Sequence, residues 1–290
     1  FKHASYKFIE LRTYAYVIST IVFIVGILSF FNGFHFGVAF KGGRSYTVQF
    51  DKNVKNDDIR DDLKKALDGD NVTIKTVGDN RHLNITTAYL KADEKADSAV
   101  KARLFQGLTK VLPAGTTYQQ FTKNNIQAYS TVQPSISDDL KRGAVKATIF
   151  AMLVIFLYIF IRFRDWRYSL GTIVALLHDV FVTLIVFSFA KNIVPFPLEI
   201  DQHFIAAILT VIGFSMNDTV IVFDRIREYS RDMKGATKTT IINRAINDTL
   251  SRTIMTSLTV FLTILILFIF GGEVTRGFAF AMLIGVVTGT

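Results

Sequence analysis

The sequence predicts an α-helical membrane protein with six spans and one small α+β domain outside the membrane. Half of the 290 residues are hydrophobic and the mean hydropathy is +0.34, which is too apolar for an ordinary soluble domain. Several apolar runs approach the roughly 20 residues needed to cross a bilayer core. A polar region, residues 37–140, separates the first run from the others and is long enough for one small domain.

The charge and the residue types narrow the possible functions. The formal net charge is +9, but most of the excess lies beside apolar runs, where membrane topology explains it better than nucleic-acid binding does. The chain has no cysteine, so disulfides and thiolate metal sites are excluded. Its five histidines form no ligand-spaced pair. We therefore expect no metal, no cofactor and no nucleic-acid partner.

The basic residues orient the predicted spans. The N-terminal segment 1–13 is basic, and so are the loop 162–167 and the segment 224–252, where seven Lys or Arg oppose four acids. Such loops stay on the cytoplasmic side. Both termini are then cytoplasmic, and residues 37–140 are extracytoplasmic. Residues 141–290 form a bundle with the first span, and the predicted spans cover 14–36, 144–161, 168–190, 203–223, 253–270 and 275–290.

The polar region alternates between strand and helix patterns. Residues 45–50, 72–77, 81–88 and 117–121 read as strands, and 56–67 and 94–112 read as amphipathic helices. A turn signal at Gly78-Asp79-Asn80 joins the two middle strands. The order β-α-β-β-α-β is the ferredoxin-like arrangement. The mixed charges on the first helix are typical of a solvated face rather than of a binding site.

The run Phe204–Phe223 contains the residue most suggestive of function. It is apolar apart from a few hydroxyls and the pair Asn217-Asp218, and Asp218 lies roughly 7 Å from its midpoint. An acid at this depth is costly and normally faces a bundle interior or an aqueous cavity. Asp218 is either a proton site, with Asn217 beside it, or an interhelical hydrogen-bond anchor, and both interpretations stay open.

Three further polar residues accompany Asp218. Asp179, next to His178 near the centre of the third span, is a second proton-handling acid or an anchor, and the anchor is favoured because adjacent helical side chains diverge by about 100°. Arg252 opens the fifth span at the end nearest Asp218. Its guanidinium either pairs with that carboxylate or extends to the head groups. Thr256, one turn further on, is a candidate hydrogen-bond donor.

These residues fall in blocks that resemble the SecF family of protein-export membrane proteins. The Asn-Asp-Thr and Ser-Arg-Thr motifs are specific together, and the resemblance covers about 14–290. One departure is Ala39, because the family usually carries an acid two residues after the first glycine of the exit motif, and the resemblance therefore does not extend to any role of that acid outside the membrane. The matching blocks are Ala175–Val180, Ile212–Glu228, Leu250–Ser257, Phe270–Val274, Gln133-Pro-Ser135 and the pair Gly42-Gly43.

The resemblance implies a function. SecF proteins belong to the RND superfamily, pair with SecD or are fused behind it, work with the SecYEG channel in the bacterial inner membrane, and use the proton gradient to draw exported, unfolded polypeptides outward. Asp218 would match the family's proton-relay aspartate and Arg252 its essential arginine. A start at Phe1 without Met fits the SecF half of a fused chain. The membrane supplies lipids as further partners, and no enzyme activity is implied.

Two other functions are compatible with the pattern. An RND-type exporter of small molecules or lipids would need a large external docking domain, and the single small domain argues against it. A structural subunit that steadies a translocon without moving protons is the other alternative. Loss of proton flux on replacing Asp218 with asparagine separates this alternative from a proton-driven subunit.

Overall fold

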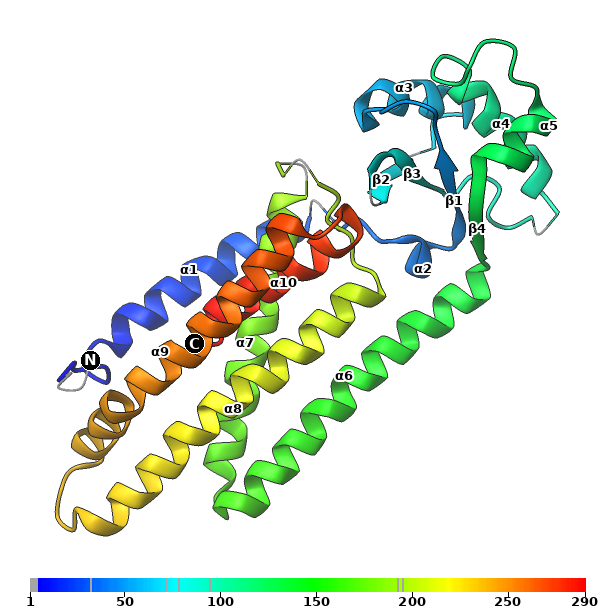
Figure 1. Cartoon of the computed structure of the whole chain (residues 1–290). Coiled ribbons are helices and arrows are strands. Elements are labelled where there is room, and N and C mark those ends of the chain that lie inside the picture. Colours follow the sequence, from blue (N-terminus) through cyan, green and yellow to red (C-terminus); the bar gives the residue numbers. More distant parts are fainter. Residues whose placement is uncertain are drawn as a thin grey trace.

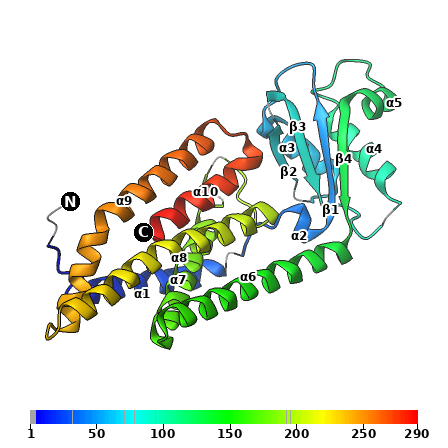
Figure 2. The same ribbon diagram turned by 60° about the horizontal axis from the view of Figure 1, so that its bottom comes forward.

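A computed structural model of the protein describes residues 5–31, 33–70, 72–77, 79–93, 95–191, 193–194 and 196–290. It consists of a bundle of long helices and a small α+β domain beyond one end of that bundle (Figure 1). A second view shows the same separation, with residues 5–11 lying near the end of helix α9 (Lys238–Phe270) that is away from the outer domain (Figure 2). The two-part architecture predicted from the sequence is therefore observed.

Six helices build the bundle. In the described part of the chain, five of them are long and apolar enough to cross a membrane, and the sixth is a shorter apolar helix. Phenylalanine rings fill much of the space between them, as in the contact of Phe187 with Phe204. The helices are α1 (Arg12–Phe30), α6 (Pro134–Phe163), α7 (Trp166–Ala190), α8 (Gln202–Asp232), α9 (Lys238–Phe270) and α10 (Glu273–Thr288).

The helix ends differ from the predicted spans for identifiable reasons. The first span was predicted to reach residue 36, but α1 stops at Phe30 and Gly33 takes a φ of +68°, which a helix does not allow. Helix α6, which contains the second predicted span, begins at Pro134, ten residues before that span. Proline is favoured at a helix start. Helices α8 and α9 continue beyond the apolar runs as amphipathic segments, and Thr237 caps α9.

The outer domain is a four-stranded antiparallel sheet with helices on one face. The strand order is β2-β3-β1-β4. The hairpin predicted between the second and third strands in the sequence is confirmed, because β2 and β3 pair in antiparallel fashion. Gly78 of its turn lies outside the described residues. Glu94, the predicted start of the second helix of this domain, also lies outside the described residues. The elements are β1 (Gly43–Gln49), α3 (Asn56–Ala66), β2 (Thr73–Val77), β3 (Asp79–Thr87), α4 (Asp97–Leu108) and β4 (Ile126–Val132), with a short helix α2 (Val38–Lys41) before β1.

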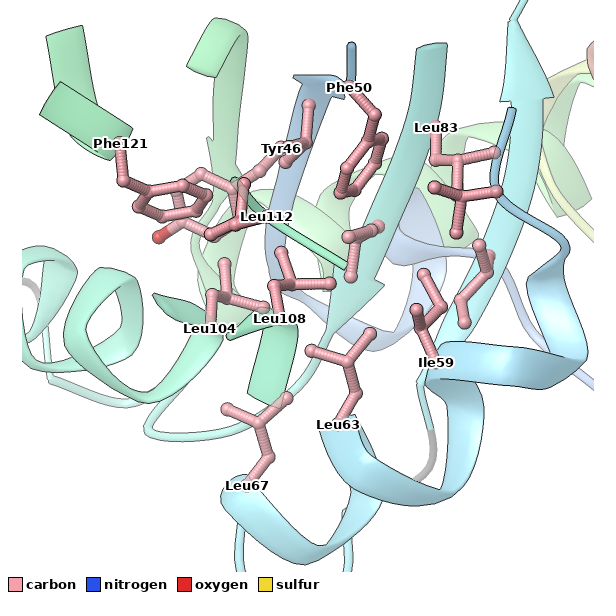
Figure 3. Close-up of a cluster of buried hydrophobic side chains, with 14 of the residues drawn as sticks. Tyr46, Phe50, Ile59, Leu63, Leu67, Leu83, Leu104, Leu108, Leu112 and Phe121 are labelled. Atoms are coloured by element: carbon pink, nitrogen blue, oxygen red, sulfur yellow. The ribbon is translucent and has the colours of Figure 1, made fainter. Parts of the chain in front are cut away.

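The core of this domain lies between the sheet and helices α3 and α4 (Figure 3). Tyr46 and Leu83 come from the strands, whereas Leu63 and Leu104 come from the helices, and all four are fully buried. Their spacing, alternate along strands and every third or fourth residue along helices, is the pattern that predicted these elements. The opposite face of the sheet is polar.

The last predicted strand is wrong. Residues 117–121 were expected to be a strand, but they begin a short helix α5 (Tyr118–Gln120) followed by a π-helical turn at Phe121–Asn125. The reason is a capping box, in which Thr117 and Gln120 bond each other's backbone amides. The strand follows at β4, an edge strand whose mostly exposed residues carry no apolar alternation to predict it.

Candidate functional site

Helix α8 places Asp218 inside the bundle. Its buried residues recur every three or four positions along one stripe, which is the helical period. Ser215 and Asp218 continue that apolar stripe and are 3% and 4% exposed. The acid is therefore carried by the face of α8 that packs against other helices, as the sequence pattern predicted.

The two carboxylate oxygens of Asp218 have different surroundings. Oδ2 lies 3.5 Å from the Ser257 hydroxyl on α9. Oδ1 has no hydrogen-bond partner among the described residues, and the same is true of the buried Thr253 hydroxyl one turn before Ser257. The Ser257 hydroxyl also accepts a hydrogen bond from Thr290, at 2.8 Å. A buried carboxylate oxygen without a partner is rare in proteins.

Arg252 is not paired with Asp218 in this structure. Its side chain is exposed, and the described contacts of Asp218 contain no ion pair with it. Thr253 and Ser257 occupy the face of α9 that meets α8, and Arg252, one residue earlier, is turned away by about 100°. Thr256 donates its hydroxyl to the Arg252 carbonyl of its own helix, so Ser257 supplies the contact that Thr256 was expected to make.

Asp179 lies at the contact between α7 and α8. Its Oδ2 accepts a hydrogen bond from Ser215 at 2.7 Å, and its Oδ1 lies 3.5 Å from Nδ1 of His178. The other ring nitrogen of His178 is 3.1 Å from the Ser19 hydroxyl on α1. Four side chains thus connect α1, α7 and α8, and Ser215 is one turn from Asp218.

The sequence did not identify every residue of this site. Asn217 is exposed on α8 and does not take part in the buried contacts of Asp218. Ser215, Ser257 and Ser19 were missed because single serines are common in membrane helices. Ser215 carried a usable signal, since it lies one turn from Asp218 in an otherwise apolar run.

The chemistry of the site is that of a protonatable group in a bundle. Among the described residues, no cluster of three acids, histidines or cysteines is placed to hold a metal ion. A buried carboxylate within a bundle of apolar helices marks a candidate functional site. Fold and site together define a helical membrane transport protein with a small extramembrane domain.

Comparison with known proteins identifies the family. Residues 114–290 match the family described as "Protein export membrane protein SecD/SecF, C-terminal", and residues 27–54 match the "SecD/SecF GG Motif". Protein translocase subunit SecF of Rhodothermus marinus is 43% identical over 291 residues, covering 100% of this chain and 90% of its own length. The chain belongs to the SecD/SecF family, as a SecF-type subunit of the Sec translocase that assists protein export and is not an enzyme.

Two fused relatives extend the comparison. Protein translocase subunit SecDF of Thermus thermophilus is 35% identical over 262 residues, covering 90% of this chain and 33% of that protein. The crystal structure of SecDF, a translocon-associated membrane protein from Thermus, has a TM-score of 0.77 at 30% identity, and the match covers 99% of this chain and 37% of the solved chain. These fusions imply that the chain associates with SecD.

Proposed function

We propose that this subunit uses the proton gradient to promote export, and that Asp218 is the group that takes up and releases the proton. The observation that carries the proposal is the environment of Asp218, which is 4% exposed and has one oxygen without a partner and a hydroxyl at 3.5 Å from the other. Among the described residues, no cation forms an ion pair with it. A buried carboxylate in such a place needs a proton or a partner charge.

Arg252 is proposed to be that partner charge in another state of the cycle. Its guanidinium stays charged at any relevant pH and can bind a carboxylate through two hydrogen bonds. In this structure it is exposed on the bundle surface, as is Asn217. Exposed polar groups at membrane depth normally face other protein rather than lipid, so both residues are assigned to the side of the bundle that SecD covers. Thr256 and Asp179 have supporting roles.

The proposed architecture follows the family. Helix α10 acts as a sixth span, the N-terminal segment lies in the cytoplasm, and residues 37–140 form a ferredoxin-like domain outside the bacterial cytoplasmic membrane. The bundle is an RND-like half that needs SecD, or a fused SecD half, as its other half. The complex works with SecYEG and with the exported polypeptide.

The proposed cycle begins with a proton from outside. Protonation neutralises Asp218, weakens its attraction to Arg252, and allows the two halves of the bundle to shift against each other. Helices α1 and α6, which flank the outer domain, carry the shift to that domain, which moves against the exported chain (Figure 1). The attraction within a desolvated ion pair is largely offset by the cost of desolvation, so its net free energy is small. Binding of one proton to Asp218 is therefore sufficient to shift the bundle from one conformation to the other.

The decisive experiment replaces Asp218 with asparagine. Asparagine keeps the shape and can accept a hydrogen bond but cannot titrate at this position. In membrane vesicles containing SecD and the translocon, we expect Asp218→Asn to assemble normally and to lose the export that depends on the proton gradient. Asp232→Asn, the same change at the exposed end of the same helix, is the matched control. Export by Asp218→Asn at the normal rate under a gradient would show a proton-independent structural subunit instead.

A further inference from the structure

The segment that precedes α8 connects the bundle to the outer domain. Phe196, Leu198 and Ile200 are buried in the hydrophobic core of the bundle. Side chains of an extended chain alternate in direction, so Glu199 points the other way, toward the domain. Asp201 then caps α8 by accepting a hydrogen bond from the Phe204 amide at 2.9 Å. Glu199 is therefore held firmly just before the helix that carries Asp218.

The partner of Glu199 is a lysine of the outer domain. On strand β2, Ile74 points into the domain core and Lys75 points to the opposite face of the sheet. The ammonium of Lys75 lies 2.7 Å from Oε2 of Glu199, and the two side chains are only 16% and 8% exposed. Strand β2 is an edge strand, and it lies beside the outer end of α10 (Figure 1).

The same segment also binds the chain that leads from α1 into the domain. The Ile200 amide donates to the His35 carbonyl at 2.7 Å, and the Gly37 amide donates to the Ile200 carbonyl at 3.1 Å. Gly37 is needed for this approach, because a Cβ there would lie 2.8 Å from Cβ of Asp201. Residues 35–37, segment 196–201 and strand β2 thus meet at one junction.

The space around the junction is polar rather than tightly packed. A cavity of about 790 Å³ adjoins the ion pair and is lined by His35 and Glu199 of the bundle side and by Thr73, Thr76 and Arg60 of the domain. Because this part of the space between domain and bundle is not filled by side chains, the orientation of the domain depends in part on directional contacts. A desolvated ion pair is such a contact, because removing one partner leaves the other charge buried and uncompensated.

We propose that Lys75 and Glu199 are positioning residues that couple α8 directly to the outer domain. The inference rests on the proposed function and adds a mechanical connection between the proton site and the outer domain. A displacement of α8 that follows protonation of Asp218 reaches β2 through segment 196–201 and this ion pair. The flanking helices α1 and α6 are then not the only mechanical connection between the proton site and the domain.

The test reverses the charges in vesicles that contain SecD and the translocon. We expect Lys75→Glu and Glu199→Lys each to lower export at least about ten-fold, since each places two like charges in a desolvated site. Combining both changes restores the pair and should return export to within about two-fold of the unmodified protein. Lys64→Glu, the same charge change on a lysine of the outer domain that lines this cavity, is the control and should export normally.

A second measurement separates coupling from folding. Proton uptake that depends on Asp218 should persist in the single variants while export is lost, because the proton site is intact and only its connection to the domain is broken. Cysteines at both positions of this cysteine-free chain should likewise export poorly and recover when a short bis-maleimide joins them.

The outcomes distinguish the two proposals. Normal export by Lys75→Glu or Glu199→Lys, failure of the double reversal, or failure of the bis-maleimide bridge to restore export would each overturn the coupling role. If those variants behave normally while Asp218→Asn loses export, only the coupling inference falls. If Asp218→Asn exports normally, the proton-driven function falls first and the coupling role falls with it.

Discussion

Asp179 offers the sharpest test of how the two buried acids of the bundle divide their roles. Its position between α7 and α8 and its 2.7 Å hydrogen bond from Ser215 are those of an interhelical anchor. Asparagine at this position keeps a carbonyl oxygen that accepts the same bond but loses the capacity to carry a proton. We therefore predict that Asp179→Asn exports normally, in contrast to Asp218→Asn.

The size of the stability effect follows from the contact. Hydrogen bonds between membrane helices contribute about 0.6 kcal/mol on average and at most about 1.7 kcal/mol. Asp179→Leu removes the acceptor, but the Ser215 hydroxyl can turn to a carbonyl of its own helix, which limits the loss. We expect Asp179→Leu to destabilise the bundle by about 1 kcal/mol through this bond and Asp179→Asn by less.

The measurement is unfolding by a denaturing detergent in mixed micelles, combined with export in vesicles. A double-mutant cycle of Asp179→Leu with Ser215→Ala should give a coupling energy of about 0.6 to 1.7 kcal/mol. The reasoning fails if Asp179→Asn folds with unchanged stability and yet exports as poorly as Asp218→Asn. Asp179 would then be a second titrating group of the proton pathway.

Two other predictions concern the outer domain and the topology. Cysteines placed at Asn80 and Lys234 should label from opposite sides of intact cells, and labelling of both from outside would contradict the orientation. Burial opposes the charge of Asp97, but the hydrogen bond and charge of Lys101, 2.6 Å away, hold the pKa of Asp97 below its ordinary value. This contribution to stability is complete above the unfolded pKa of about 3.9 and is lost as the pH falls through the lower folded pKa. The protection of α4 amides against hydrogen exchange, taken relative to the intrinsic exchange rate at each pH, should therefore fall in acid, and less steeply in Lys101→Met, whereas an identical pH dependence in both proteins would refute this.

Much of the fold is encoded in local periodicity, which is why it was predictable. The burial of Asp218 follows from its phase on the apolar stripe of α8, and the order of elements in the outer domain follows from alternation and turn residues. The strand predicted at 117–121 failed because the capping box formed by Thr117 and Gln120 is an equally local signal that favours a helix.

The contacts of the site were less predictable, because they depend on how one helix is rotated against another. Thr256 and Ser257 are neighbours with the same functional group, and a rotation of about 100° decides which of them reaches Asp218. The pairing of Arg252 with Asp218 depends in the same way on the packing of α9. The link between Lys75 and Glu199 joins residues far apart in the sequence, and no local pattern distinguishes them from other exposed charges.

The geometry of α8 explains why a small change at Asp218 is sufficient to affect the outer domain. Sixteen residues separate Gln202 from Asp218, which corresponds to roughly 24 Å along the helix. A tilt of about 5° around the level of Asp218 would move the outer end of α8 by about 2 Å. The Lys75–Glu199 contact is only 2.7 Å long and largely buried, so it cannot stretch by that amount without exposing two charges. The domain therefore has to follow the helix or lose the contact.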